Sequence, residues 1–353
     1  MRVRRTLSAV LIISQASLAD AQNPLRHFTE GVQARFDRTQ PVLAYTLSAR
    51  ASDTTGFDVR IAIRNAPDTF HLAMAKHPEY DDRFFRFVQN VNVGERGASV
   101  TREDSTLWRV IAPAGVATVT YRVQLPASPT PRAAWRPFLT PTGMLSGGPH
   151  AFMYVVGAEL APASVRLELP ESWSVATGLT PTSVPRTYFA ASAYDLVESP
   201  VLAGVLRRWS FAIDGVPHTV AYWPLPGAAA FDTTAFVGNI ERMAREVVRL
   251  FGRAPYREYT FQIQDGAYGA LEHPNSVSLG IPSAELAKDA AAGLPETAHE
   301  FIHTWNLMRI RPAEYTGVSY RAIRPVPTLW FSEGLTLMYA DLLLRRAQLP
   351  TYD

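Results

Sequence analysis

The pattern of apolar and polar positions divides the chain into two parts of different texture. From about residue 40 to residue 224, apolar side chains alternate with polar ones in short runs, which is the period of a half-buried β-strand. The clearest of these runs lie at 57–63, 119–125 and 165–169. Asp214-Gly215 separates two further apolar runs and predicts a tight hairpin. Short strands at this spacing are typical of an antiparallel sandwich.

After Pro226 the texture changes to that of helices. Apolar residues recur with a helical period from Asp232, a candidate N-cap, to Phe251, and Gly252 follows as a stop signal. Pro295 is suited to the first turn of a later helix. The other expected elements are a strand at 259–264, a turn-rich segment at 265–273, a strand at 276–280, a small helix near 283–291 and a last helix at 328–346.

These elements predict an α+β protein with two domains. Residues 22–225 are expected to form an antiparallel β-sandwich-like N-terminal domain, and residues 226–353 a second domain. Within the first domain, the segment 126–150 is rich in proline and glycine, so we expect it to form one long loop.

Residues 1–21 have the features of a cleavable signal peptide. Three arginines among the first five residues precede an apolar run at 7–18, and Ala19-Asp20-Ala21 fits the small-x-small rule for cleavage. The alternative is a membrane anchor, but a spanning helix needs about 20 apolar residues and this run is shorter. We therefore expect an exported protein, periplasmic or secreted, with no membrane span after cleavage.

Composition argues against several classes of function. The chain carries a net charge of +2, and the predicted signal peptide contains three arginines and one aspartate, so the remainder is near neutral. Without a basic stripe, nucleic acid is not an expected partner. The chain contains no cysteine, which excludes a disulfide framework, a catalytic cysteine and thiolate-bound zinc. No G-x-S-x-G sequence supports a serine hydrolase.

The helix expected at Pro295 contains the pattern H-E-x-x-H, formed by His299, Glu300 and His303. Positions i and i+4 lie on one helical face, so both imidazoles can bind one metal ion at about 2.0–2.1 Å. Glu300 can lie beside the open coordination position. Alone, the pattern is only suggestive, because it also arises by chance. The histidines without this spacing are expected to be surface or packing residues: His27, His71, His77, His150 and His218.

A third ligand candidate lies in the last helix. Glu333 is the only charged residue in the segment 328–339, and a lone carboxylate is costly to bury in an apolar helix unless something pairs with it. A metal ion would be such a partner. The alternatives are a narrow solvent-exposed face or an ion pair with an arginine such as Arg309 or Arg324.

Three segments together resemble a known family. H-E-F-I-H-T-W-N at 299–306, followed by L-W-F-S-E-G-L-T-L-M-Y-A-D at 329–341, is similar to the glycyl aminopeptidase family of gluzincin zinc metallopeptidases. Upstream, G-A-L-E-H at 269–273 resembles the G-G-L-E-H exopeptidase motif of that family, with Ala270 in place of the second glycine.

The resemblance implies a thermolysin-like zincin catalytic domain at 226–353 that binds one Zn²⁺ per chain. His299, His303 and Glu333 would be its ligands. Glu300 would be the general base that takes a proton from the zinc-bound water and passes it to the leaving amine.

The resemblance also implies how a peptide substrate is held. Glu272 would bind the α-ammonium of the first substrate residue, and Gly269 and Ala270 belong to the same substrate-binding segment. This contact would place only the first peptide bond at the metal, which is aminopeptidase action. Without the resemblance, a glutamate in a turn is more simply explained as solvated.

Two alternatives stay open. One is an endopeptidase of the same fold, in which Glu272 has no amine to hold. The other is a non-catalytic zincin-like peptide-binding protein, against which the intact H-E-x-x-H and Glu333 argue. Members of the family continue into a helical region and commonly a PDZ domain. We therefore expect the chain to be a fragment whose last helix, apolar on more than one face, packs against a missing lobe.

Overall fold

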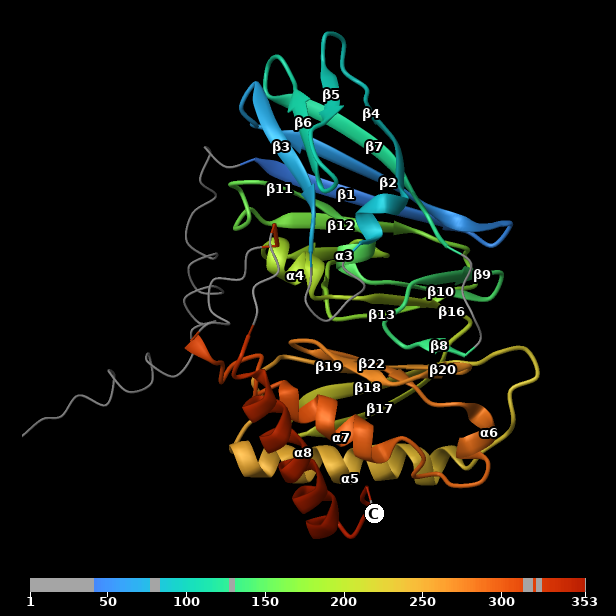
Figure 1. The fold of residues 1–353 in the computed structure, drawn as a ribbon. Coiled ribbons are helices and arrows are strands. Elements are labelled where there is room, and N and C mark those ends of the chain that lie inside the picture. Colours follow the sequence, from blue (N-terminus) through green and yellow to red (C-terminus); the bar gives the residue numbers. More distant parts are fainter. Residues whose placement is uncertain (1–40, 77–82, 127–130, 314–319, 322–325, 353) are drawn as a thin grey trace, which may run out of the picture. The chain divides into compact units, whose positions relative to one another are not determined.

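A computed structural model describes residues 41–76, 83–126, 131–313, 320–321 and 326–352. The predicted signal peptide at 1–21 lies outside the described residues. No helix in the described part is long and apolar enough to cross a membrane. Figure 1 shows sheets in the first part of the chain and a sheet with helices in the second, as the α+β prediction requires.

Three sheets build the N-terminal part. The seven-stranded sheet has the order β14 (Thr180–Pro181), β15 (Thr187–Ala190), β12 (Ala163–Glu168), β1 (Val42–Arg50), β2 (Asp53–Arg64), β7 (Val116–Gln124) and β4 (Val88–Val93). A four-stranded sheet has the order β13 (Ser174–Thr177), β16 (Val201–Gly204), β10 (Gly143–Ser146) and β9 (Phe138–Thr140). The other has the order β11 (Met153–Val155), β3 (Thr69–Met74), β6 (Leu107–Ile111) and β5 (Ser99–Arg102). The short helices here are η1 (Phe84–Phe87), α3 (Gly148–Ala151) and α4 (Ala193–Val197).

The alternating sequence runs form strands whose apolar residues face one core. In β2, Phe57, Val59, Ile61 and Ile63 are each at most 2% exposed. They belong to an apolar cluster that also contains residues of the two four-stranded sheets, so the sheets pack face to face. Most neighbouring strands are antiparallel, as predicted, but β1 and β12 pair in parallel.

The segment 126–150 is not one long loop, so that expectation is wrong. It contains β9, β10, the short strand β8 (Arg132–Ala133) and the start of α3. Its glycines serve close packing. At Gly143, a Cβ atom would lie 2.2 Å from Nε1 of Trp223, so only glycine lets β10 approach that ring.

The second part consists of one sheet and its helices. The sheet has the order β17 (Arg207–Ile213), β18 (Val216–Trp223), β19 (Tyr259–Gln264), β22 (Ser276–Gly280) and β21 (Ala270–Glu272). The helices are α5 (Thr233–Phe251), α6 (Ser283–Leu286), α7 (Leu294–His303) and α8 (Leu329–Arg346). An apolar cluster joins the sheet to α5, α7 and α8. β20 (Ala267–Tyr268) pairs separately with β8.

The predicted hairpin at Asp214-Gly215 is confirmed, and it belongs to this second sheet. Asp214 and Gly215 both have positive φ, 50° and 80°, as a two-residue type I′ turn requires. β18 then pairs in parallel with β19. The expected domain boundary at residue 225 therefore separates strands that the structure joins in one sheet.

Helix α5 follows its predicted signals. The Asp232 side chain accepts a hydrogen bond from the Ala235 N–H, and Gly252 ends the helix with φ 82°. The strands at 259–264 and 276–280 have the predicted bounds. The small helix near 283–291 is shorter than expected and spans only Ser283–Leu286.

Candidate metal centre

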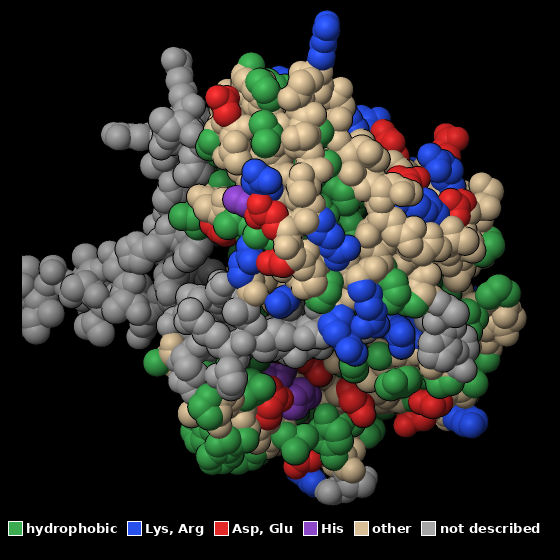
Figure 2. Space-filling model, turned by 45° about the horizontal axis from the view of Figure 1, so that its top comes forward, with side chains coloured by type: hydrophobic (Ala, Val, Ile, Leu, Met, Phe, Trp, Pro, Cys, Tyr) green, Lys and Arg blue, Asp and Glu red, His purple; other side chains and the backbone are tan. Residues whose placement is uncertain are grey.

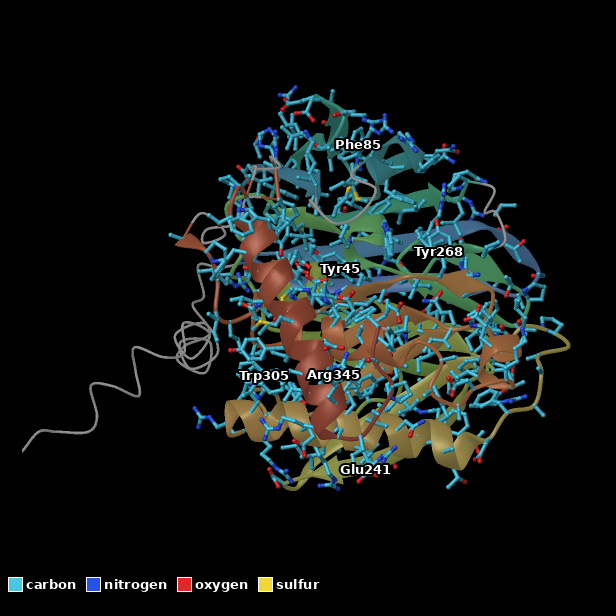
Figure 3. The ribbon with its side chains drawn as sticks, turned by 60° about the horizontal axis from the view of Figure 1, so that its bottom comes forward. Tyr45, Phe85, Glu241, Tyr268, Trp305 and Arg345 are labelled. Carbon is cyan, nitrogen blue, oxygen red and sulfur yellow. The ribbon has the colours of Figure 1, made fainter. Side chains whose placement is uncertain are left out.

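Helix α7 presents the H-E-x-x-H residues from a firmly packed helix. Pro295 lies in its first turn, where its missing N–H needs no partner. Phe301 and Ile302 are fully buried against the second sheet and α5. After α7, Trp305, which Figure 3 labels near α5, stacks on Phe251 of that helix. The two ring centroids lie 4.8 Å apart. This packing fixes the rotation of α7 and thereby the direction in which its two histidines point.

Three candidate ligand atoms, two histidine nitrogens and one glutamate oxygen, lie close together. Nε2 of His299 and Nε2 of His303 lie 3.0 Å apart. Oε2 of Glu333 lies 3.1 Å from the first and 3.3 Å from the second. Ligand atoms at about 2.0–2.1 Å from a tetrahedral metal lie about 3.3 Å from one another. The spacing and the two-histidine, one-carboxylate set therefore fit zinc.

The pKa values of the His303 and Glu333 side chains are also consistent with a cation site. Burial lowers the pKa of His303, but the hydrogen bond to Glu333 and the nearby carboxylates outweigh burial and raise it to about 10. Burial opposes ionisation of Glu333, yet the hydrogen bonds from both histidines lower its pKa to about 2. These shifts show that the three side chains favour positive charge between them, which a bound divalent cation would supply.

Glu300 and Glu272 lie beside this cluster. The two carboxyl groups are in hydrogen-bond contact with each other. Burial, and then the Glu272 carboxylate, raise the pKa of Glu300 well above its usual range. Glu272 is only 6% exposed, so it is not the solvated turn residue of the simplest alternative. Figure 2 shows histidine side chains recessed among acidic ones in its lower half.

Strand β21 carries Glu272 along an open edge of the second sheet. Gly269 accepts a hydrogen bond from Gly280 N–H, and His273 N–H donates to Ser276, so these groups face β22. Because hydrogen-bonded and open positions alternate in an antiparallel pair, the backbone groups of Ala270 and Glu272 face away from β22. A peptide can pair with such an edge.

Gly269 and Ala270 differ in whether their backbone conformation and surroundings admit a side chain. Gly269 has φ 71°, and a Cβ there would lie 3.0 Å from the Trp135 ring, so the position favours glycine. Ala270 is not among the described residues with positive φ, so alanine fits where the family motif has glycine.

Arg309 does not form the alternative ion pair with Glu333. Arg309 is occupied by the backbone carbonyls of Thr304, Pro274 and Pro255. Arg324 lies outside the described residues.

Sequence reasoning missed the residues that hold His303. Its Nδ1–H donates to the Asn306 carbonyl at 2.9 Å, and the Thr336 hydroxyl lies 3.4 Å away. In the sequence, polar Thr336 within a mostly apolar helix is the feature that indicates a contact of this kind.

Residues 44–205 match the Peptidase M61 N-terminal domain, and residues 294–353 match the M61 glycyl aminopeptidase. The two matches together cover more than half of the chain, including both ligand helices. The chain belongs to the M61 glycyl aminopeptidase family. This confirms the resemblance seen in the three motifs. The three residues that converge here, His299, His303 and Glu333, all lie within the matched segment 294–353.

Solved structures share the fold of this M61 chain. An aminopeptidase N family protein from Idiomarina loihiensis is 22% identical, with a TM-score of 0.76 over 87% of this chain and 55% of that chain. A mutant M1 zinc metallopeptidase from Deinococcus radiodurans, bound to a Tyr-Ser-Ala substrate, is 17% identical, with a TM-score of 0.52 over 88% and 72%. The M61 chain thus spans about half the length of the Idiomarina protein. No curated protein matches it in sequence.

Proposed function

We propose that the protein is an exported, zinc-dependent aminopeptidase that hydrolyses the N-terminal peptide bond of peptides. The observation that carries the proposal is the convergence of three ligand atoms within 3.3 Å of one another, beside the paired carboxyls of Glu300 and Glu272. Family membership supports a metallopeptidase, and the predicted signal peptide supports export to the periplasm or outside the cell.

His299, His303 and Glu333 would hold one zinc ion. When bound, zinc supplies Lewis acidity, which polarises the scissile carbonyl and makes water acidic enough to be the nucleophile near neutral pH. Glu300 is the general base in this proposal. Its carboxylate takes the proton of the attacking water and gives it to the leaving amine. Burial, and then the neighbouring Glu272 carboxylate, raise the pKa of Glu300, which suits a carboxyl group that first takes a proton and then gives it up.

Glu272 would bind the free ammonium of the first substrate residue. β21 runs from Ala270 to Glu272, so a peptide pairing antiparallel with it starts at Glu272 and continues past Ala270 toward Gly269. The contact of the substrate ammonium with Glu272, together with the pairing of the peptide with β21, would thus determine which peptide bond lies at the zinc. This arrangement supports removal of one residue at a time.

The test compares peptides with a free and an acetylated N-terminus. The aminopeptidase proposal predicts cleavage of the free peptide and little cleavage of the acetylated one. Glu272→Gln should lower kcat/KM for the free peptide about 30-fold or more, because it leaves a buried charge without its partner. Glu285→Gln, an exposed glutamate on α6, is the control.

Equal cleavage of both peptides would favour the endopeptidase of the same fold. Tight peptide binding without any cleavage, in zinc-loaded protein, would favour the non-catalytic peptide-binding protein. Either outcome would contradict the aminopeptidase proposal.

A further inference from the structure

The turn that follows α7 holds a strained backbone. Leu307 has φ 108°, in a region that non-glycine residues avoid. The residue is fully buried, and its N–H donates to the Ile310 carbonyl at 2.9 Å. The next N–H, of Met308, donates to the His303 carbonyl at 3.0 Å. These contacts hold the strained turn against the end of the ligand helix.

The strained turn directs the Asn306 carbonyl at a metal ligand. The carbonyl accepts the Nδ1–H of His303 at 2.9 Å. A neutral imidazole that donates from Nδ1 keeps its lone pair on Nε2, which is the nitrogen that faces His299 and Glu333. The turn therefore selects the tautomer of His303 that can bind a metal.

The side chain of the same residue reaches the other ligand helix. Asn306 Nδ2 donates to the Ser332 carbonyl at 2.9 Å and to Thr336 Oγ1 at 2.7 Å. Ser332 directly precedes Glu333, and Thr336 lies one turn after it. A carbonyl and a hydroxyl both accept here, so the amide nitrogen, and not its oxygen, must face them.

We propose that Asn306 is a positioning residue that fixes both ligand helices of the zinc site relative to each other. Through its carbonyl it orients His303 of α7, and through its amide it sets the register of α8 at Glu333. This inference rests on the zinc site of the proposed function. Glu333 needs such a tie because its side chain is 41% exposed, whereas that of His303 is 2% exposed. Burial alone therefore does not place Glu333.

Asn306→Ala tests the proposal, because it removes both amide bonds and keeps the carbonyl that holds His303. We expect the Kd for zinc, measured on the full chain by competition with a chelator, to rise about 10–100-fold. The unfolding midpoint of the zinc-free chain should fall only modestly, because two partly buried hydrogen bonds are lost and no large apolar contact is. Co²⁺ bound in place of zinc should show an altered visible spectrum. Asn239→Ala is the matched control, since that amide donates to the Ala290 carbonyl at 3.3 Å, away from the ligands.

A second pair of variants tests the same tie from α8. Thr336→Val removes the hydroxyl that accepts from Asn306, whereas Thr336→Ser keeps it. We expect weaker zinc binding in the valine variant and recovery in the serine variant. This pair keeps the proposal testable if Asn306→Ala does not fold.

Three outcomes would overturn the inference. The first is unchanged zinc affinity in Asn306→Ala, and the second is equal loss in the two Thr336 variants. Both leave the proposed function intact. The third is an unmutated chain that binds no zinc, which overturns the metal site itself and this inference with it.

Discussion

The two helices that carry the candidate zinc ligands of this M61 chain, α7 and α8, are packed in different ways. Helix α7 buries six of its ten residues, including the aromatic Phe301 and the ligand His303. Helix α8 buries only small residues near Glu333, and its large buried side chains, Leu343 and Leu344, lie toward its C-terminal end. Five other large apolar side chains of α8 are exposed: Trp330 (74% exposed), Phe331 (54%), Leu337 (47%), Met338 (52%) and Leu342 (45%).

This difference shows that apolar content alone does not decide which helix face packs. On α8, Ser332, Thr336 and Ala340 recur every four residues and form the buried side. Small side chains let α8 approach α7 closely, but they fix its position less firmly than a large aromatic does. The chain compensates with a specific polar tie, the Asn306 amide. Large buried side chains position α7 next to its histidines, whereas near Glu333 the small buried residues of α8 are supplemented by the hydrogen bonds of Asn306.

The largest expected effect concerns the chemistry that α7 carries. Glu300→Gln should lower turnover about 10²–10⁴-fold while zinc stays bound, because the base is lost and no ligand is changed. Steady-state kinetics and metal content, measured on the same preparations, check this. Glu296→Gln is the control, as an exposed glutamate in the first turn of the same helix. Turnover within a few-fold of the unmutated protein would remove Glu300 from the mechanism.

The next effect tests how α7 is anchored. Phe301→Ala should lower the free energy of unfolding by about 3–5 kcal/mol, since the ring is fully buried among aromatic side chains. Denaturant titration gives the value. A loss below about 1 kcal/mol would mean that burial does not hold this helix.

A smaller effect concerns a buried histidine that packs on α7. His218 bonds the Val216 carbonyl and the Tyr256 hydroxyl, and burial lowers its pKa to about 4. Below a pH of about 6.5 the unfolded chain gains a proton on this side chain that the folded chain does not bind, so stability falls as pH drops toward 4. The expected loss is about 3 kcal/mol.

Denaturant titrations at pH 7.5 and 4.5 check this loss. His218→Gln should reduce the difference between the two pH values, because the titrating group is gone. The surface variant His71→Gln should retain it. If His218→Gln leaves the difference unchanged, the acid sensitivity has another origin.

The smallest effect is expected on the outer side of α8. Trp330→Ala should change the free energy of unfolding by less than about 0.5 kcal/mol, although it removes a larger side chain than Phe301→Ala does. The same titration measures both variants. A loss comparable to that of Phe301→Ala would show that something covers Trp330, and the contrast between the two helices would then disappear.

Local signals predicted much of this fold correctly. The Asp232 cap, the Gly252 stop and the turn at Asp214-Gly215 act over a few residues, so the sequence displays them directly. The segment 126–150 was misjudged because its glycines allow close contact with residues far along the chain, Gly143 with the Trp223 ring and Gly148 with the backbone of Leu196 and Val197. Contacts of that kind leave no periodic trace in the sequence.

The residues of the candidate site also differ in whether local sequence signals could identify them. Spacing within one helix identified His299 and His303, and Glu333 stood out as a lone charge. The proximity of Glu272 to Glu300, and the reach of Asn306 into α8, depend on how separate elements pack. The sequence gives no reason to single out Asn306, because its contacts depend on the backbone turn at Leu307, which no local sequence pattern predicts.

Zinc content is the measurement that tests the central claim most directly. The account predicts about one zinc per chain in the purified, unmutated protein after removal of free metal. In His303→Ala the zinc should be lost, because the two remaining protein ligands do not hold it firmly. Stoichiometric zinc in that variant, or none in the unmutated chain under conditions where it is folded, would contradict the assignment of this site.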